Sequence, residues 1–268
     1  MDLRIGARIG RGASWRRGLR GAVGVLAPLL LLACTDDAVA PRPSAGGAIS
    51  LTFDDGRRGV LAHAAPIVAS LGLRANVAVM TTRYWDQQLT WDELRLLRDA
   101  GWTVVSHSMT HPDLTALTPD SARAEIRASR RTIDSLGFHA GIFVVPYLLH
   151  DAAVLREVAE AGYDFARCCA HDPAWSSDTL LDWPIARDAR HRLVGVDATD
   201  YGAPSTYNFR TPEGRARLGS LLDDAMARGK YVDLFFHEIT PADTADLRAT
   251  LALLGPHRGR MVRYDELR

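Results

Sequence analysis

The chain has 268 residues, 47% of them apolar, which is enough for one large domain with a sizeable hydrophobic core. Its 32 basic and 32 acidic side chains balance, but residues 1–33 hold six arginines against one acid, so the remainder carries a net charge of −5. A nucleic-acid-binding domain is expected to be basic, so we expect no nucleic-acid partner.

The first 33 residues have the order of an export signal: a basic region precedes the apolar segment 21–33, which is too short to span a membrane comfortably. The segment ends in Leu-Leu-Ala-Cys, which resembles a bacterial lipobox, where the signal is cut before a cysteine that receives a lipid. We therefore expect a lipoprotein signal peptide at 1–33 and a lipidated Cys34 that anchors an exported protein to the membrane of the cell envelope. The alternative is an ordinary signal followed by a chance cysteine.

Residues 34–47 are small, polar and proline-containing, which favours a flexible tether, so we expect the folded domain to span residues 48–268. Within that domain the cysteines are Cys168 and Cys169. Adjacent cysteines rarely form a disulfide, because their Cα atoms lie about 3.8 Å apart and a disulfide normally spans about 4.4–6.8 Å. We expect buried free thiols.

Beyond residue 47, short apolar runs alternate with amphipathic stretches that carry helix start signals. Thr90 and Glu93 have the spacing of a capping box, and Thr118 followed by Pro119 begins a second helix that closes on Gly137. The apolar runs are typical of strands buried on both faces, and they lie at 48–53, 75–80, 102–106, 141–146, 163–169, 191–197 and 231–236. This alternation predicts a single-domain α/β fold, a parallel sheet closed into a (β/α) barrel.

Polar side chains follow four of the predicted strands. They are Asp54 and Asp55, His107 and His111, Tyr147, and His237. Because the working residues of α/β barrels lie at the carboxyl ends of the strands, we expect these four groups to meet on one rim.

His107 and His111 are four residues apart, so on a helical turn both imidazoles lie on one face, where they can bind one metal ion. On its own this spacing favours surface or capping histidines. The adjacent Asp54 and Asp55 favour a metal site instead, because a cation bound by one carboxylate offsets the repulsion felt by the other. One Asp and two His also leave positions open for water and substrate, as a catalytic zinc site requires.

Four motifs, TFDDG at 52–56, HSMTH at 107–111, VPY at 145–147 and FFH at 235–237, resemble in order and spacing those of the polysaccharide deacetylase family. This family is also called the NodB-homology domain or carbohydrate esterase family four. The resemblance spans Ile49 to His237. It implies a distorted (β/α) barrel and metal-dependent removal of acetyl groups from sugars.

The family pattern implies a role for each matched residue. The ligands of a divalent metal ion, for which Zn²⁺ is favoured, would be Asp55, His107 and His111. The catalytic residues would be the general base Asp54, the general acid His237 and Tyr147, whose backbone N–H would help to bind the oxyanion.

The chain departs from the family pattern at several positions. Many members have an arginine that orients the base two residues before the Pro-Tyr pair, where this chain has Val144. Arg187 is a candidate substitute from another strand, or else a surface arginine. Leu148 replaces the usual glycine, and Asp182 with Trp183 partly matches an Asp-Trp motif whose indole flanks the sugar pocket.

We expect an exported hydrolase that releases acetate from an N-acetylated polysaccharide such as peptidoglycan, a chitin-like chain or poly-N-acetylglucosamine. Two alternatives stay open. One is a carbohydrate-binding pseudoenzyme that keeps the metal, against which the presence of Asp54 and His237 argues. The other is a deacetylase of O-acetyl esters or small amides.

Overall fold

The computed structural model describes residues 46–267 except 83–86, 140, 172–176 and 200–205. The predicted signal peptide, Cys34 and most of the predicted tether lie outside the described residues. Over the part of the chain that is described, no helix combines the length and apolar character needed to cross a membrane.

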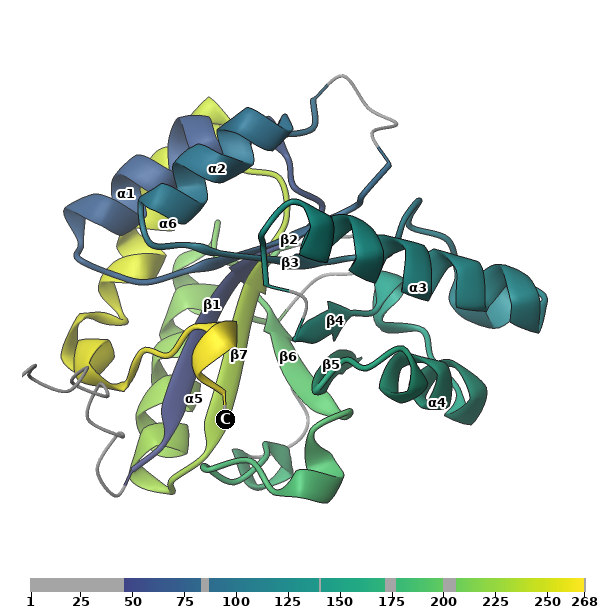
Figure 1. The fold of residues 1–268 in the computed structure, drawn as a ribbon. Helices are drawn as coiled ribbons and strands as arrows, with labels where there is room; N and C mark the ends of the chain where they lie inside the picture. Colours follow the sequence, from purple (N-terminus) through teal and green to yellow (C-terminus); the bar gives the residue numbers. More distant parts are fainter. Residues whose placement is uncertain (1–45, 83–86, 140, 172–176, 200–205, 268) are drawn as a thin grey trace, which may run out of the picture. The chain divides into compact units, whose positions relative to one another are not determined.

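Seven parallel strands form a closed barrel in chain order, with β1 paired to both β2 and β7 (Figure 1). Each predicted apolar run overlaps one strand, and the bounds differ by at most two residues. The prediction of a (β/α) barrel is thus confirmed. The strands are β1 (Ala48–Phe53), β2 (Asn76–Val79), β3 (Thr103–Ser106), β4 (Ile142–Val144), β5 (Phe165–Ala170), β6 (Leu193–Asp197) and β7 (Tyr231–Phe236).

Helices lie on the outside of the barrel, with α1, α2 and α6 grouped on one side and α3 beside α4 (Figure 1). The predicted capping box forms at the start of α2: Thr90 Oγ1 accepts from the Glu93 N–H at 3.2 Å, and the Glu93 carboxylate accepts from the Thr90 N–H at 2.7 Å. The helices are α1 (Ala65–Ser70), α2 (Trp91–Asp99), α3 (Pro119–Ser135), α4 (Ala152–Glu160), α5 (Pro212–Ala227) and α6 (Thr244–Ala252).

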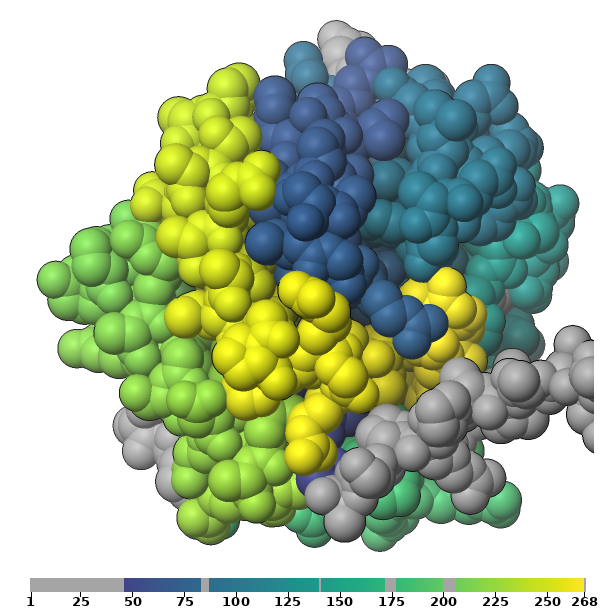
Figure 2. All heavy atoms as spheres, turned by 90° about the vertical axis from the view of Figure 1, so that its left-hand side faces the viewer, coloured from purple at the N-terminus to yellow at the C-terminus, as the bar shows by residue number. Residues whose placement is uncertain are grey.

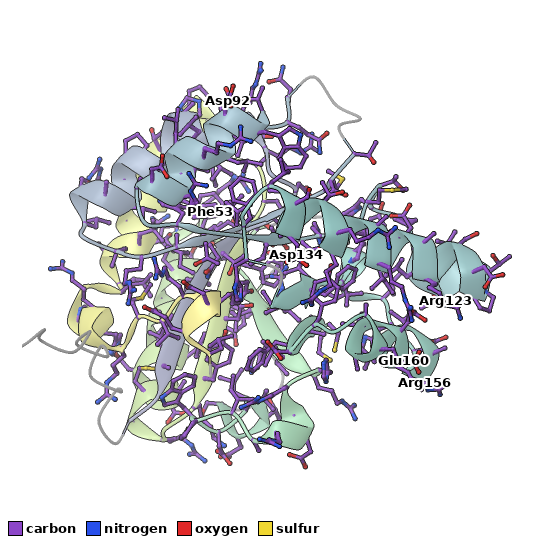
Figure 3. All side chains as sticks on the ribbon, in the orientation of Figure 1. Phe53, Asp92, Arg123, Asp134, Arg156 and Glu160 are labelled. Carbon is purple, nitrogen blue, oxygen red and sulfur yellow. The ribbon has the colours of Figure 1, made fainter. Side chains whose placement is uncertain are left out.

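The main hydrophobic core lies between the barrel and the helices. Alternate β1 side chains point outward into it, and the ring of Phe53 packs 5.5 Å from Trp102 and 5.4 Å from Phe236. Figure 3 labels Phe53 between α2 and the sheet, and Asp92 on the outer surface of that helix. Each strand therefore buries one face against helices and the other inside the barrel.

The barrel interior contains buried charged groups. Asp233 of β7 is fully buried there, accepts a hydrogen bond from the Thr52 hydroxyl at 3.0 Å, and accepts a second from the Tyr264 hydroxyl. The buried guanidinium of Arg167 stacks over the ring of Phe235, 4.0 Å from its centroid. A charged group in such an interior requires a partner.

The C-terminal segment closes the amino-terminal end of the barrel. The Val262 N–H donates to the Ile49 carbonyl at 2.9 Å, and the Tyr264 N–H donates to Asn76 Oδ1 at 2.9 Å. Figure 2 shows the yellow C-terminal residues against the blue early part of the chain. An open site therefore belongs at the opposite, carboxyl end of the strands.

Candidate metal and catalytic site

The predicted site residues gather at the carboxyl ends of the strands. Asp54 and Asp55 directly follow β1, His107 follows β3, and His237 follows β7. In a parallel barrel these positions share one rim. The structure thus brings together the polar groups that the strand order predicts to be neighbours.

Asp55, His107 and His111 direct their ligand atoms at a common point. Asp55 Oδ1 is 3.6 Å from His107 Nε2 and 3.5 Å from His111 Nε2. The two Nε2 atoms are 3.1 Å apart, and one ligand atom from each of the three residues lies within 4.8 Å of the others. One oxygen and two nitrogens in this arrangement match a catalytic zinc site with an open position.

The neighbouring groups leave a lone pair on His107 Nε2 and on Asp55 Oδ1 that could bind a cation. His107 Nδ1 lies 2.8 Å from the Val144 carbonyl oxygen, which can only accept, so Nδ1 carries the proton and Nε2 presents a lone pair. Asp55 Oδ2 lies 3.8 Å from Arg57 Nε, whereas Asp55 Oδ1 is buried and accepts no hydrogen bond from any described residue. The three residues therefore fit a divalent cation.

Charge and burial keep these ligands in the forms that bind metal. Burial alone would raise the pKa of Asp55, but His107, followed by His237 and His111, holds it well below its usual value. Burial, and then His107, lowers the pKa of His111 to about 4. At neutral pH Asp55 is therefore a carboxylate and His111 a neutral imidazole.

The backbone around the ligands adopts a conformation that few residues other than glycine tolerate. The φ angles of Asp55, Ser108 and His111 are 68°, 64° and 62°. Such strain occurs where surrounding contacts hold it, and it is concentrated at functional sites. The Ser108 hydroxyl is one such contact, since it accepts from the His111 N–H at 2.9 Å.

Glu125 of α3 forms hydrogen bonds with the loop between His107 and His111. Its buried carboxylate accepts from the N–H of Met109 at 2.9 Å, the N–H of Thr110 at 2.8 Å and the Thr110 hydroxyl at 2.6 Å. We expect Glu125→Ala to weaken metal binding by about 10–100-fold, the usual cost of losing an outer contact of a ligand. Competition with a chelator would measure this.

Asp120 offers a matched control, because it is an exposed acid on the same helix. Asp120→Ala should leave the metal affinity unchanged. Unchanged affinity in folded Glu125→Ala would contradict the role of that carboxylate.

Asp54, the predicted base, contacts an arginine that the sequence motifs do not reveal. Arg167 Nη2 of β5 donates to Asp54 Oδ2, and the arginine is completely buried. Asp54 Oδ1 is also buried and accepts no hydrogen bond from the described residues. One oxygen is thus held in place while the other is available to accept a proton.

Arg167 belongs to the polar interior of the barrel. Its Nε lies 3.7 Å from Asp233 Oδ2, so one guanidinium faces two carboxylates. Burial raises the pKa of Asp233 to about 6, although Arg167 opposes this rise. Asp54 is therefore linked to the barrel interior by a chain of contacts: Arg167 pairs with Asp54 and Asp233, and Asp233 accepts a hydrogen bond from Tyr264.

His237, the predicted acid, is positioned by a hydroxyl. The Thr199 hydroxyl donates to Asp197 Oδ1 at 2.7 Å and lies 2.7 Å from His237 Nδ1. Because that hydroxyl has one proton and gives it to Asp197, Nδ1 of His237 is the donor in the second bond. The sequence analysis did not identify Thr199, since no spacing pattern marks it.

Tyr147 lies in η3 (Pro146–Leu148), the turn that follows β4. It has a φ of 54° and Leu148 has a φ of 60°, so two residues other than glycine adopt the left-handed conformation in this turn. The Tyr147 ring packs edge-on to His111, 4.5 Å between centroids, and its side chain is 62% exposed. The Tyr147 ring therefore forms an apolar edge beside His111, and Leu149, two residues further along the chain, is also exposed.

Trp183 and Arg187 do not join this site. Trp183 stacks on Tyr231, the first residue of β7, 5.9 Å between centroids, whereas the site lies beyond the last residue of that strand. Five residues of strand separate these ends by about 16 Å. Arg187 is exposed in the segment before β6. Arg167, and not Arg187, is the arginine that contacts Asp54.

Comparison with known proteins relates this arrangement to one family. Residues 42–166 match the family model for polysaccharide deacetylase. The protein YxkH of Bacillus subtilis (strain 168), which is named as a polysaccharide deacetylase, is 24% identical over 118 residues, or 43% of this chain. The match covers 42% of YxkH, so the chain spans under half of this relative.

Solved structures share the fold. The chitin deacetylase of the fungal pathogen Colletotrichum lindemuthianum has a TM-score of 0.59 and 20% identity, over 84% of this chain and 88% of that one. A carbohydrate esterase family 4 pseudoenzyme of Bacillus anthracis has a TM-score of 0.54 and 17% identity, over 84% and 66% of the two chains. At these identities the likeness establishes the barrel, and the chemistry must be argued from the site.

Proposed function

We propose that the chain is a metal-dependent hydrolase that releases acetate from an N-acetylated polysaccharide, because residues 42–166 match the model of the polysaccharide deacetylase family. The observation that carries this proposal is the convergence of Asp55, His107 and His111 beside Asp54, whose free oxygen is available as a base. A pseudoenzyme that has lost turnover would have little need for a base and an acid that are both held in place by hydrogen bonds.

Asp55, His107 and His111 would hold the ion, with Zn²⁺ favoured by the set of one oxygen and two nitrogens. When bound, a divalent cation would polarise the acetyl carbonyl and make the attacking water more acidic. Asp54 accepts the proton of that water on Oδ1, while Arg167 keeps Oδ2 fixed. The buried position of Asp54 excludes competing water from this carboxylate.

Departure of the amine needs a proton, which we assign to His237. Its Nδ1–H is held by Thr199, so in the imidazolium form the proton on Nε2 is the one that can be given to the leaving amine. The Tyr147 N–H would donate to the developing oxyanion, a contribution commonly of about 3–4 kcal/mol per donor. The exposed ring of Tyr147 and Leu149 beside it would contact the sugar.

Peptidoglycan, chitin-like chains and poly-N-acetylglucosamine are the substrates to examine, because export and anchoring would place the enzyme beside polymers of the cell envelope. This location is supported by the order of a basic region, an apolar segment and Leu-Leu-Ala-Cys in residues 1–34, which predicts an export signal and a lipidated Cys34. Replacing Cys34 by Ala should release the protein from membrane fractions, and a variant that stays fully in that fraction would contradict a lipid anchor.

The test of the function is acetate release from chitooligosaccharides, peptidoglycan and acetylated xylan in parallel. We expect release from at least one N-acetylated polymer, loss of activity after chelation, and recovery on adding Zn²⁺. His107→Ala should lose both metal and activity. Saccharide binding without acetate release from a metal-loaded protein would contradict the proposal and indicate a binding role.

A further inference from the structure

A second group of metal-ligating side chains lies on the side of β5 that faces the helices. It consists of His150, Cys168 and Cys169, which offer ligand atoms within 4.8 Å of one another. The two Sγ atoms are 2.8 Å apart, and Cys169 Sγ is 3.9 Å from His150 Nε2. None of the three takes part in the hydrolysis described above.

A β-bulge places the adjacent thiols on the same side. In a regular strand, neighbouring side chains point to opposite faces. The pairing of β5 with β6 passes from Arg167 opposite Leu193 to Cys169 opposite Val194, so two steps in β5 match one in β6. Arg167 points into the barrel, whereas Cys168 lies in the outer core and Cys169 packs against that core. Bulges commonly re-aim a side chain in this way.

His150 is oriented for the thiols by the backbone. It lies just after η3, and its Nδ1 is 3.1 Å from the Leu148 carbonyl oxygen. A carbonyl can only accept, so Nδ1 carries the proton and Nε2, on the side of Cys169, presents a lone pair. A backbone carbonyl on the remote nitrogen is the usual outer contact of a metal-binding histidine, and Val144 plays the same part for His107.

We propose that His150, Cys168 and Cys169 form a second cation site, which takes a thiophilic divalent ion of the zinc class. Two sulfurs and one imidazole are the ligands that such ions prefer. This set leaves a fourth coordination position to water or an external ligand. Because His150 lies two residues after the end of η3, an ion bound here also restrains the turn that carries Tyr147.

The geometry needs only a small adjustment. In tetrahedral zinc, a sulfur and a nitrogen ligand lie about 3.5 Å apart and two sulfurs about 3.8 Å. The observed 3.9 Å between Cys169 and His150 is close to this value, and the 2.8 Å between the thiols must open by about 1 Å. The half-buried Cys169 can make this movement by rotation of its side chain. A disulfide is disfavoured by the short Cα separation of adjacent residues.

Cobalt titration of the full chain tests this site. The protein carries Cys34→Ala, so that every thiol signal comes from Cys168 and Cys169, and Asp55→Ala with His107→Ala, so that the catalytic ligands are removed. Thiolate bound to Co²⁺ gives an intense charge-transfer band in the near ultraviolet, which oxygen and nitrogen ligands do not give. We expect one equivalent of Co²⁺ to bind with this band, and Zn²⁺ to displace it.

Two half-buried positions supply variants that should still fold. Cys169→Ser should abolish the charge-transfer band, and His150→Gln should weaken Co²⁺ binding by at least about tenfold. Circular dichroism confirms that each variant is folded. Failure of this test leaves the hydrolase proposal intact, because the catalytic ligands are absent from the titrated protein.

Two results would overturn the proposal. One is the absence of the band in folded protein whose two thiols titrate as free. The other is a Cys168–Cys169 peptide whose mass is lower by two hydrogens in freshly purified, unoxidised protein, which would show a disulfide in place of the cation site.

Discussion

Replacing Asp54 by Asn is expected to lower kcat for acetate release by about 10²–10⁴-fold, the usual contribution of a general base. The amide keeps the shape of the side chain but cannot accept the proton that Oδ1 is placed to receive. The metal content should not change, because Asp55 and not Asp54 faces the two imidazoles. Elemental analysis and acetate release from the same preparation would measure both quantities.

Asp55→Asn is the matched control, since it changes the adjacent carboxylate in the same way. It should lose metal and activity together. Near-normal turnover in Asp54→Asn would show that another group is the base.

Replacing Arg167 by Leu is expected to reduce the free energy of unfolding by about 3–5 kcal/mol, because removing one partner leaves buried charges uncompensated. The guanidinium faces both Asp54 and Asp233, and all three side chains are buried. Acetate release should also fall, since Asp54 Oδ2 loses its donor. Urea unfolding and acetate release would measure the two effects.

The destabilisation in Arg167→Leu should depend on pH. Burial already raises the pKa of Asp233 to about 6, above the ordinary value, so this group favours the folded state most when it is protonated. Without Arg167 the pKa should rise further. The loss of stability should therefore be smaller near pH 5 than near pH 8.

Arg187→Leu is the control for this variant, because Arg187 is an exposed arginine without a carboxylate at the site. Stability and activity should stay within the small range usual for surface substitutions, about 0.5 kcal/mol. A larger loss of activity in Arg187→Leu than in Arg167→Leu would restore the sequence-based assignment of the orienting arginine.

The barrel could be predicted from the sequence because its strands are buried on both faces. Such strands read as continuous apolar runs, and the bounds of β1 and β7 match the predicted ranges. The candidate metal ligands could be predicted for a related reason, since His107 and His111 are close in sequence and follow β3, whose end lies at the rim. Patterns within a short stretch of sequence are therefore enough to predict both the strands and these candidate ligands.

Contacts between distant strands could not be predicted in the same way. Arg167 and Asp54 are 113 residues apart and meet only because β5 and β1 enclose the same interior. One signal was available: an arginine inside the apolar run 163–169 must be paired if it is buried. Strand alternation would have placed it inside the barrel, but its partner depends on register and closure.

The position of Tyr264 makes the electrostatics of the proposed base depend on a segment about 210 residues further along the chain than Asp54. Its hydroxyl binds Asp233, which lies beside Arg167, which in turn holds Asp54. Until residues near 264 have docked at the amino-terminal end of the barrel, Asp233 lacks the hydrogen bond from the Tyr264 hydroxyl. Acquisition of activity during folding should consequently follow docking of the C-terminal segment rather than assembly of the first strands.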